Sequence, residues 1–266
     1  MSQRKGRVLI IAGSDSGGGA GIQADIKTVT ALGGYAATAI TAITVQNTLG
    51  VTGIHPIPLD VVEAQARAVL EDIGADVIKT GMLGTRELVD SLAYLLAGYP
   101  GIPLVLDPVM VATSGDTLVG EGVVDAIRER LLPHAALITP NAPEAEKLTG
   151  LTVSTTQQQA EAGQKLVDMG ADAALVKGGH LSGSVITDVL VTSTMKLVFE
   201  TRRQDTRNTH GTGCTLASAI AAGLAKGASL PDAIEAAGSY LSEAIRRAPG
   251  FGAGHGPVHH AWVVDR

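Results

Sequence analysis

The sequence predicts an α/β fold: a three-layer α/β/α sandwich whose central sheet is mostly parallel, with a short antiparallel edge. Three observations predict it. Apolar runs of strand length recur along the 266 residues, each run is continuous rather than alternating, and stretches with helical spacing separate the runs. Continuous apolar runs are typical of strands that are covered on both faces. Strands that alternate with helices in this way form right-handed βαβ units around a parallel sheet.

The elements can be assigned in chain order. Six apolar runs predict the parallel strands: 8–12, 36–43, 75–78, 103–106, 135–138 and 173–176. The stretches between them predict helices: 21–32, 59–73, 85–96, 120–132 and 156–169. After residue 180 two strand patterns follow each other directly and predict an antiparallel pair, 185–191 and 196–201. Two final helices are expected over 213–225 and 231–247, the second with Pro231 in its first turn.

The charge and cysteine content exclude several classes of protein. The chain carries 20 Lys and Arg against 26 Asp and Glu, a formal net charge of −6, and has no basic block. It therefore lacks the electrostatic footprint of a protein that binds nucleic acid or an anionic membrane. The single cysteine, Cys214, excludes an internal disulfide and a multi-cysteine zinc site, and agrees with a reducing, cytoplasmic location.

Two stretches without Asp, Glu, Lys or Arg, 28–59 and 208–225, have the low charge of membrane spans. Both are rich in Thr and Gly, and neither supplies about 20 apolar residues in a row. The apolar run 8–12 is also shorter than the roughly 7–15 apolar residues of a secretory signal. Since no linker, repeat or charge discontinuity interrupts the chain, residues 1–266 are expected to form one domain.

Parallel sheets bind ligands beyond the carboxyl ends of their strands. Four of the predicted strands are followed at once by polar side chains: Lys79, Asp107, Asn141 with Glu144, and Lys177. All four ends lie on the same edge of the predicted sheet. Lysines, carboxylates and an amide that converge there suit a polyphosphate together with Mg²⁺, which takes one or two carboxylates plus phosphate oxygens and water.

The first strand leads into a glycine-rich loop, residues 13–21, which can wrap its backbone around a ligand. Part of it, Gly19-x-Gly21-x-x-Ala24, matches the dinucleotide-binding fingerprint. That fingerprint also needs an acidic residue at the end of the second strand, where this chain reads Thr44-Val-Gln-Asn-Thr48. A dinucleotide site is therefore disfavoured.

The densest signal is the stretch 208–215, which leads directly into a predicted helix. Small residues at a helix start leave several backbone N–H groups aimed at one point, and the helix dipole adds positive potential. This predicts an anion site, although no Walker loop occurs in the chain. Cys214 lies in the first turn, where its thiol pKa is expected to fall below the free value.

Six motifs together resemble the hydroxymethylpyrimidine/phosphomethylpyrimidine kinases of thiamine biosynthesis, a family of the ribokinase-like superfamily. They occur in the family's order and cover almost the whole chain: Gly13–Lys27, Thr41–Thr48, Lys79–Met82, Asp107–Met110, Val176–His180 and His210–Cys214. The resemblance implies a ribokinase-like fold and a homodimer. It also implies that MgATP phosphorylates 4-amino-5-hydroxymethyl-2-methylpyrimidine, first to the monophosphate and then to the diphosphate.

The resemblance further implies which residues bind the pyrimidine. Asp25 and Gln46 would hydrogen-bond the amino group and the ring nitrogens, since a carboxylate and an amide match a donor beside acceptors. Gly13 would let the first strand approach the ring, and Met82 and Val109 would pack on its faces. In this family alanine often stands where this chain has Val45, so the bulkier side chain is expected to reshape the ring pocket.

The remaining implied roles concern ATP and catalysis. Lys177 would contact the phosphates, and Glu144 with Asp107 would hold Mg²⁺. The ATP and phosphate site is completed by Asn141, Thr209, Gly211, Thr212 and Gly213. Gly211 and Gly213 would form an anion hole for the transferring phosphoryl group. Many sugar kinases of the superfamily have an aspartate base where this chain has Cys214, and we expect the thiol to matter less than the glycines around it.

Two other functions remain open from the sequence. A pyridoxal or pyridoxine kinase of the same superfamily, or an enzyme with both activities, would act on a similar hydroxymethyl-bearing nitrogen heterocycle. A protein that only binds or senses a vitamin precursor belongs to a different class, but it would not need Lys177, Glu144 and Cys214. The pair His259-His260 lacks further metal ligands at a useful spacing and is expected to lie in a surface tail.

Overall fold

A computed structural model describes residues 6–112 and 115–264 of the chain. Its centre is a nine-stranded sheet in the order β3-β2-β1-β4-β5-β6-β7-β8-β9. The strands run over Arg7–Asp15 (β1), Tyr35–Asn47 (β2), Gly50–Pro56 (β3), Val77–Thr80 (β4), Leu104–Leu106 (β5), Ala135–Ile138 (β6), Ala173–Val176 (β7), Val185–Thr192 (β8) and Lys196–Arg202 (β9). The neighbours β2, β1, β4, β5, β6 and β7 pair in parallel, as predicted. The sandwich with a mostly parallel sheet is confirmed.

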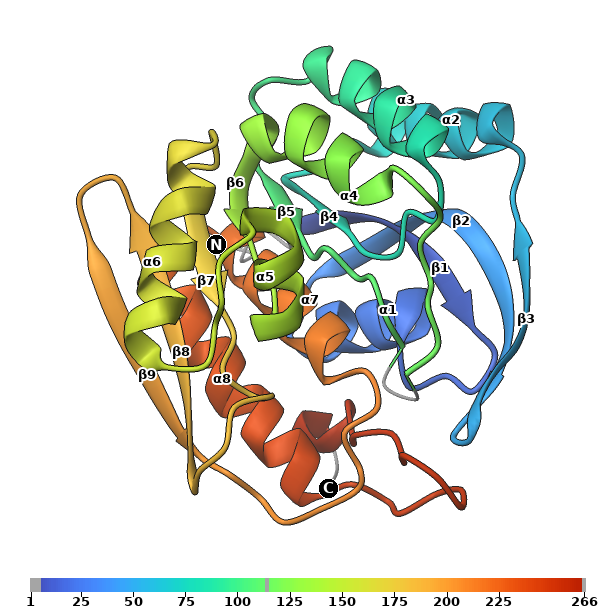
Figure 1. Cartoon of the computed structure of the whole chain (residues 1–266). Coiled ribbons are helices and arrows are strands. Elements are labelled where there is room, and N and C mark those ends of the chain that lie inside the picture. The colour runs from blue at the N-terminus through green and yellow to red at the C-terminus, as the bar shows by residue number, and fades with distance from the viewer. Residues whose placement is uncertain (1–5, 113–114, 265–266) are drawn as a thin grey trace, which may run out of the picture.

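Strand β1 explains why its apolar run is continuous. Val8 and Ile10 face the helical layer of α1 (Gly21–Ala31), α7 (Thr212–Ala225) and α8 (Leu230–Arg246). Leu9 and Ile11 face the opposite layer. Since side chains alternate between the two faces of a strand and both faces are covered, every position must be apolar. Figure 1 shows the sheet between the two layers.

The second layer packs on the other face of the sheet. Its helices are α2 (Leu59–Ala68), α3 (Arg86–Ala97), α4 (Val123–Ala126), α5 (Ala142–Thr149) and α6 (Thr156–Asp168). The predicted helix 120–132 is shorter than expected, because α4 passes into a π-helical turn and then a 3₁₀ turn that contains Pro133. The short helix α5 was not predicted. Asn141 caps it, and its Pro143 lies in the first turn.

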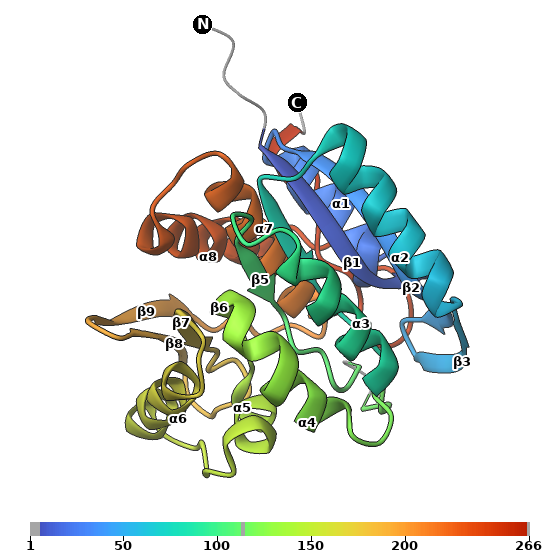
Figure 2. The ribbon, with the colours of Figure 1, turned by 90° about the horizontal axis from the view of Figure 1, so that it is seen from above.

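The sheet has an antiparallel strand pair at both edges, whereas the sequence predicted one. Strands β8 and β9 form the predicted pair. At the other edge β2 continues past residue 43 and turns back as β3. Figure 2 shows β3 and the β8–β9 pair at opposite sides of the molecule. The second hairpin lacked a continuous apolar signal because polar residues such as Thr44, Gln46 and Thr52 interrupt it.

Both uncharged stretches of the sequence are accounted for by ordinary elements. The stretch 28–59 covers the end of α1 and the β2–β3 hairpin, and 208–225 covers the loop before α7 and that helix. In the described part of the chain, no helix combines the length and the hydrophobicity needed to cross a bilayer.

Candidate active site

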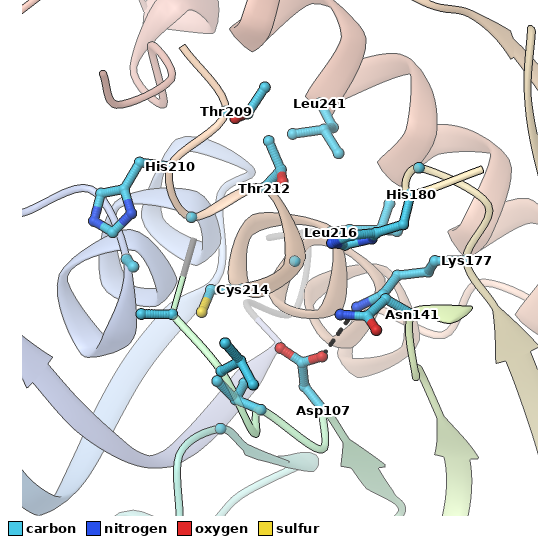
Figure 3. Close-up of a pocket in the computed structure, with 18 of the residues that line it drawn as sticks. Asp107, Asn141, Lys177, His180, Thr209, His210, Thr212, Cys214, Leu216 and Leu241 are labelled. Atoms are coloured by element: carbon cyan, nitrogen blue, oxygen red, sulfur yellow. Dashed lines mark hydrogen bonds and ion pairs between the residues drawn. The ribbon is translucent and has the colours of Figure 1, made fainter. Parts of the chain in front are cut away.

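A cavity of about 710 Å³ lies at the carboxyl ends of the parallel strands, as the sequence predicted. Of the predicted site residues, Asp25 and the strand-end Lys79 do not line it, and all the others do: Gly13, Gln46, Met82, Asp107, Val109, Asn141, Glu144, Lys177, Thr209, Gly211, Thr212, Gly213 and Cys214. Figure 3 shows Cys214 between His210 on one side and the Asp107–Lys177 pair on the other. The fold therefore brings side chains from both ends of the chain to one space.

The N-terminus of α7 forms one wall of this cavity. Gly211 caps the helix in the left-handed region, at φ 78°, and a Cβ there would lie 1.8 Å from the carbonyl oxygen of Gly19. Only glycine fits this position. The first N–H groups of a helix have no partners within it, and in α7 these include the N–H groups of Gly213 and Cys214. With the helix dipole they form an anion site.

The side chains of Lys177 and Asp107 meet beside this anion site. Lys177 Nζ lies 3.2 Å from Asp107 Oδ1, which also accepts a hydrogen bond from the Thr139 hydroxyl at 3.1 Å. A methyl group added to Gly213 would lie 3.4 Å from Lys177 Nζ and 4.0 Å from Asp107 Oδ2. Burial opposes the charge of Lys177, but Asp107 and Glu144 raise its pKa above the usual value. The lysine is therefore a permanent cation at the helix N-terminus.

Glu144 is held by the backbone. It completes a capping box with Asn141: the Asn141 N–H donates to Glu144 Oε2 at 2.8 Å, and the Glu144 N–H donates to Asn141 Oδ1 at 2.9 Å. Two residues that the family resemblance assigned to ATP and Mg²⁺ therefore also form a helix start. Burial raises the pKa of Glu144 to about 7, against the opposing effect of Lys177.

The residues present fit a magnesium ion that is held chiefly by a substrate. Asp107 Oδ2 is buried and has no hydrogen-bond partner in the structure. Within residues 6–112 and 115–264, no three His, Cys, Asp or Glu side chains converge on a metal position. Mg²⁺ commonly takes one or two carboxylates and completes its shell with phosphate oxygens and water. Asp107 and Glu144, which both line the cavity, suit that kind of site.

Cys214 departs from the expectation for a helix N-terminus. Burial raises the pKa of its thiol to about 12, and the nearby Lys79 offsets this only in part. The helix start and a buried lysine would favour the thiolate, but the loss of solvation outweighs both. The predicted lowering of the pKa is therefore wrong, and the side chain is a neutral thiol near pH 7.

Asp25 does not reach the cavity, which corrects the expectation that it contacts the pyrimidine. Its carboxylate is fully buried and accepts hydrogen bonds from Lys79 Nζ at 2.9 Å and from the Ser218 hydroxyl at 2.6 Å. Burial alone would lower the pKa of Lys79, but Asp25 raises it, so the two form a buried ion pair. Both partners lie far from Asp25 in the sequence, and no local pattern indicated them.

Two further side chains lie elsewhere than predicted. Val45 is 62% exposed and does not line the cavity, so it does not reshape the ring pocket. His260 lies in no surface tail: it is buried, and its Nε2 lies 3.0 Å from the Thr215 hydroxyl of α7. Burial lowers the pKa of His260 to about 4.

Asp15 and His210 form a contact that the sequence analysis missed. His210 Nε2 lies 2.8 Å from Asp15 Oδ2, and both side chains line the cavity. Asp15 also accepts the backbone N–H groups of the glycine-rich loop, from Gly17, Gly19 and Ala20. Although burial opposes it, these hydrogen bonds lower the pKa of Asp15. The glycine-rich loop is thereby joined to the loop before α7.

The end of the cavity beyond Lys177 was also missed. Arg203 organises the loop there by donating to the carbonyl oxygens of Gly179, Leu181 and Gly183. The opposite wall comes from one face of α8: Gly238, Leu241, Ser242 and Ile245. A helix face of small and apolar residues carries no signal that distinguishes a ligand wall from a core contact.

Comparison with known proteins agrees with this geometry. The sequence profile of a family described as phosphomethylpyrimidine kinase matches residues 15–259. The chain belongs to the phosphomethylpyrimidine kinase family. Among its relatives in this family, the hydroxymethylpyrimidine/phosphomethylpyrimidine kinase of Streptomyces coelicolor is 47% identical over 97% of this chain and 95% of its own length. The expected family is therefore confirmed.

Two further comparisons extend the picture. The thiamine biosynthesis bifunctional protein ThiED of Geobacter sulfurreducens is 50% identical over 98% of this chain, which spans 53% of that longer protein. A crystal structure of an ADP complex of Bacillus subtilis pyridoxal kinase superposes with a TM-score of 0.91 and 36% identity, over 98% of this chain and 100% of that one. The phosphomethylpyrimidine kinase family thus has close structural neighbours with a second named activity.

Proposed function

We propose that this chain uses ATP to phosphorylate the hydroxymethyl group of 4-amino-5-hydroxymethyl-2-methylpyrimidine and then phosphorylates the resulting monophosphate to the diphosphate, in thiamine biosynthesis. The observation that carries the proposal is the meeting of Lys177, Asp107 and the α7 N-terminus at one place in the cavity. Relatives over nearly the whole chain are named for these two phosphorylations.

The pyrimidine occupies the half of the cavity next to β1 and β2. Gln46 supplies hydrogen bonds there, and Met82 and Val109 supply apolar surface. A methyl group on Gly13 would lie 3.4 Å from the Met82 side chain, so glycine keeps this space open for a flat ring. The nucleotide occupies the other half, between the 177–184 loop and α8.

Phosphoryl transfer depends mainly on positioning and on electrostatic stabilisation. The N–H groups of Gly213 and Cys214 face the charge that develops on the transferring phosphoryl group, and Lys177 neutralises it. Thr209 and Thr212 add hydroxyl donors at the same helix start. The neutral Cys214 thiol is a poor base for the acceptor alcohol, so these donors contribute more than the thiol does.

Asp107 and Glu144 would hold Mg²⁺. When bound, the ion supplies positive charge between the phosphates of ATP. The unpartnered Oδ2 of Asp107 is the atom that supports this assignment.

The working enzyme is a cytoplasmic homodimer in this proposal. The free thiol of the single cysteine agrees with a reducing compartment. The β2–β3 hairpin exposes large apolar side chains, among them Ile43, Val45, Leu49 and Ile54. An exposed apolar edge strand is suited to cover by a second copy of the chain.

Pyridoxal phosphorylation is the second candidate. It is favoured by the 36% identity and the TM-score of 0.91 to a pyridoxal kinase. Pyridoxal also carries a hydroxymethyl group on a flat nitrogen heterocycle, so the same reaction centre serves it.

The test is to incubate the purified protein with MgATP and, separately, the hydroxymethylpyrimidine, its monophosphate and pyridoxal, and to resolve the products by mass. Successive appearance of the pyrimidine monophosphate and diphosphate is expected. A Lys177→Met protein, purified in parallel, controls for contaminating kinases because it lacks the cation at the helix N-terminus. If only pyridoxal gives a product, the protein is a pyridoxal kinase. If no acceptor gives a product, the protein binds its ligand without phosphorylating it.

A further inference from the structure

The alternation of side chains along β2 turns Gln46 into the cavity. Up to Val45, which pairs with Gly53, the two strands are in register, and then the register shifts so that Gln46 pairs with Val51. The extra residue of this bulge, Thr52, lies on β3, so successive side chains of β2 keep pointing to opposite faces. Thr44 and Gln46 therefore share the face that lines the cavity, and Val45 between them is exposed.

The backbone of Gln46 is fixed on both sides by one hydroxyl group. The Gln46 N–H donates to Ser16 Oγ at 2.9 Å, and Ser16 Oγ donates to the Gln46 carbonyl oxygen at 2.7 Å. The glycine-rich loop therefore sets where the Gln46 side chain begins. These two bonds do not decide whether the carboxamide presents its oxygen or its nitrogen to the cavity.

The Thr44 hydroxyl decides that orientation. Thr44 Oγ1 lies 2.9 Å from the carbonyl oxygen of Ser14 and 3.0 Å from Gln46 Oε1, and Thr44 is buried. A hydroxyl has one hydrogen to donate, so it cannot serve two oxygen acceptors at once. The Ser14 carbonyl can only accept. When the Ser14 carbonyl oxygen accepts the hydrogen of the Thr44 hydroxyl, the Thr44 oxygen can only accept from Gln46. The Gln46 carboxamide then rotates by a half-turn, so that its Nε2–H donates to Thr44 Oγ1.

We infer that Thr44 is a positioning residue that turns the carbonyl oxygen of Gln46 toward the cavity, and that it thereby selects rings with an amino group beside a ring nitrogen. The inference rests on the proposed function. In this orientation of the carboxamide, Gln46 Oε1 accepts a hydrogen bond from the amino group of the ring. The second hydrogen of Gln46 Nε2 is then free to donate to the adjacent ring nitrogen. A ring with an oxo group beside a ring N–H has the opposite pattern and needs the opposite orientation. Mismatched polar groups that are buried discriminate strongly between substrates.

The test compares kcat/KM for the hydroxymethylpyrimidine with kcat/KM for its 4-oxo counterpart. Thr44→Val removes the hydroxyl and keeps the shape, so the carboxamide is free to turn for either ring. The preference for the amino ring is expected to fall about tenfold, chiefly because the oxo ring improves, as one hydrogen bond of ordinary strength would give. Thr44→Ser keeps the hydroxyl and is expected to keep the wild-type preference.

A merely structural role for Thr44 would lower kcat/KM for both rings equally and leave their ratio unchanged, and that result would overturn the inference. If Thr44→Val does not fold, Thr44→Ala carries the same expectation. The wild-type protein distinguishes the proposed function from the role of Thr44. If the wild-type protein phosphorylates neither ring, the proposed function is wrong. If it phosphorylates the amino ring and the ratio of the two kcat/KM values is the same in the Thr44 variants, only the role of Thr44 is wrong.

Discussion

Lys79 Nζ lies 2.9 Å from both carboxylate oxygens of Asp25, and neither side chain is exposed. Because the Ser218 hydroxyl also donates to Asp25, the ion pair joins β4, α1 and α7 behind the wall of the cavity. α7 is the helix whose N-terminus forms the anion site. A residue expected to touch substrate thus holds the helix that faces it.

We predict that Asp25→Asn or Lys79→Met alone lowers the free energy of unfolding by about 3–5 kcal/mol, because each leaves a buried charge without its partner. The double variant should lose less than the sum of the two, which urea denaturation of all four proteins will measure. KM for the pyrimidine in folded Asp25→Asn should stay within about threefold of wild type. A large rise in KM at unchanged stability would instead restore Asp25 as a substrate contact.

Cys214→Ala and Gly213→Ala form a matched pair of small changes in the first turn of α7. A thiol whose pKa is about 12 is a poor base, so Cys214→Ala should lower kcat by less than about 10²-fold, below or at the bottom of the range for one acid–base group. The methyl group of Gly213→Ala would lie 3.4 Å from Lys177 Nζ, in the space of the phosphoryl group, and should cost about 10²–10³-fold. Steady-state kinetics will measure the loss of kcat in each variant, with thermal unfolding as the control for stability. A larger loss in Cys214→Ala than in Gly213→Ala would show that the thiol contributes more to catalysis than the glycine.

Activity should depend on the ionisation of Glu144. Its pKa of about 7 predicts that kcat/KM for MgATP rises between pH 6 and pH 8, as the carboxyl loses its proton. A terminal phosphate also titrates, near pH 6, so the profile must be compared with that of Glu144→Gln. The variant should be less active, and its kcat/KM should no longer rise with pH near pH 7. If kcat/KM rises with pH in the same way in both proteins, the titrating group is the nucleotide phosphate and not Glu144.

The buried His260 should make the fold sensitive to acid. The unfolded chain binds a proton at this histidine near pH 6.5, but the folded chain does so only near pH 4. Between these values the unfolded state holds more protons, so the free energy of unfolding falls as the pH falls, by about 3 kcal/mol in all. In His260→Gln this part of the loss should be absent. Urea unfolding of both proteins at pH 7, 5.5 and 4.5 will measure it, and parallel pH curves would contradict the assignment.

The sequence by itself determined the parallel core of the sheet and the edge at which its strands end in polar residues. Continuous apolar runs and helical spacing depend only on residues near one another in the chain, and the polar residues that end each strand, such as Asp107 and Lys177, are placed by the same local rule. The anion site at Gly211–Gly213 was predictable for the same reason. A glycine at a positive φ and the free N–H groups of a helix start are local properties.

Only the tertiary structure decided which polar side chains have a hydrogen-bond or ion-pair partner within the protein. Asp25 lies 54 residues from Lys79 and 193 from Ser218, and Asp15 lies 195 residues from His210. The raised thiol pKa of Cys214 and the lowered pKa of His260 likewise follow from burial by distant segments. A local pattern states which groups a chain offers. Whether each group meets a ligand, an internal partner or only apolar surroundings depends on which segments the fold packs around it.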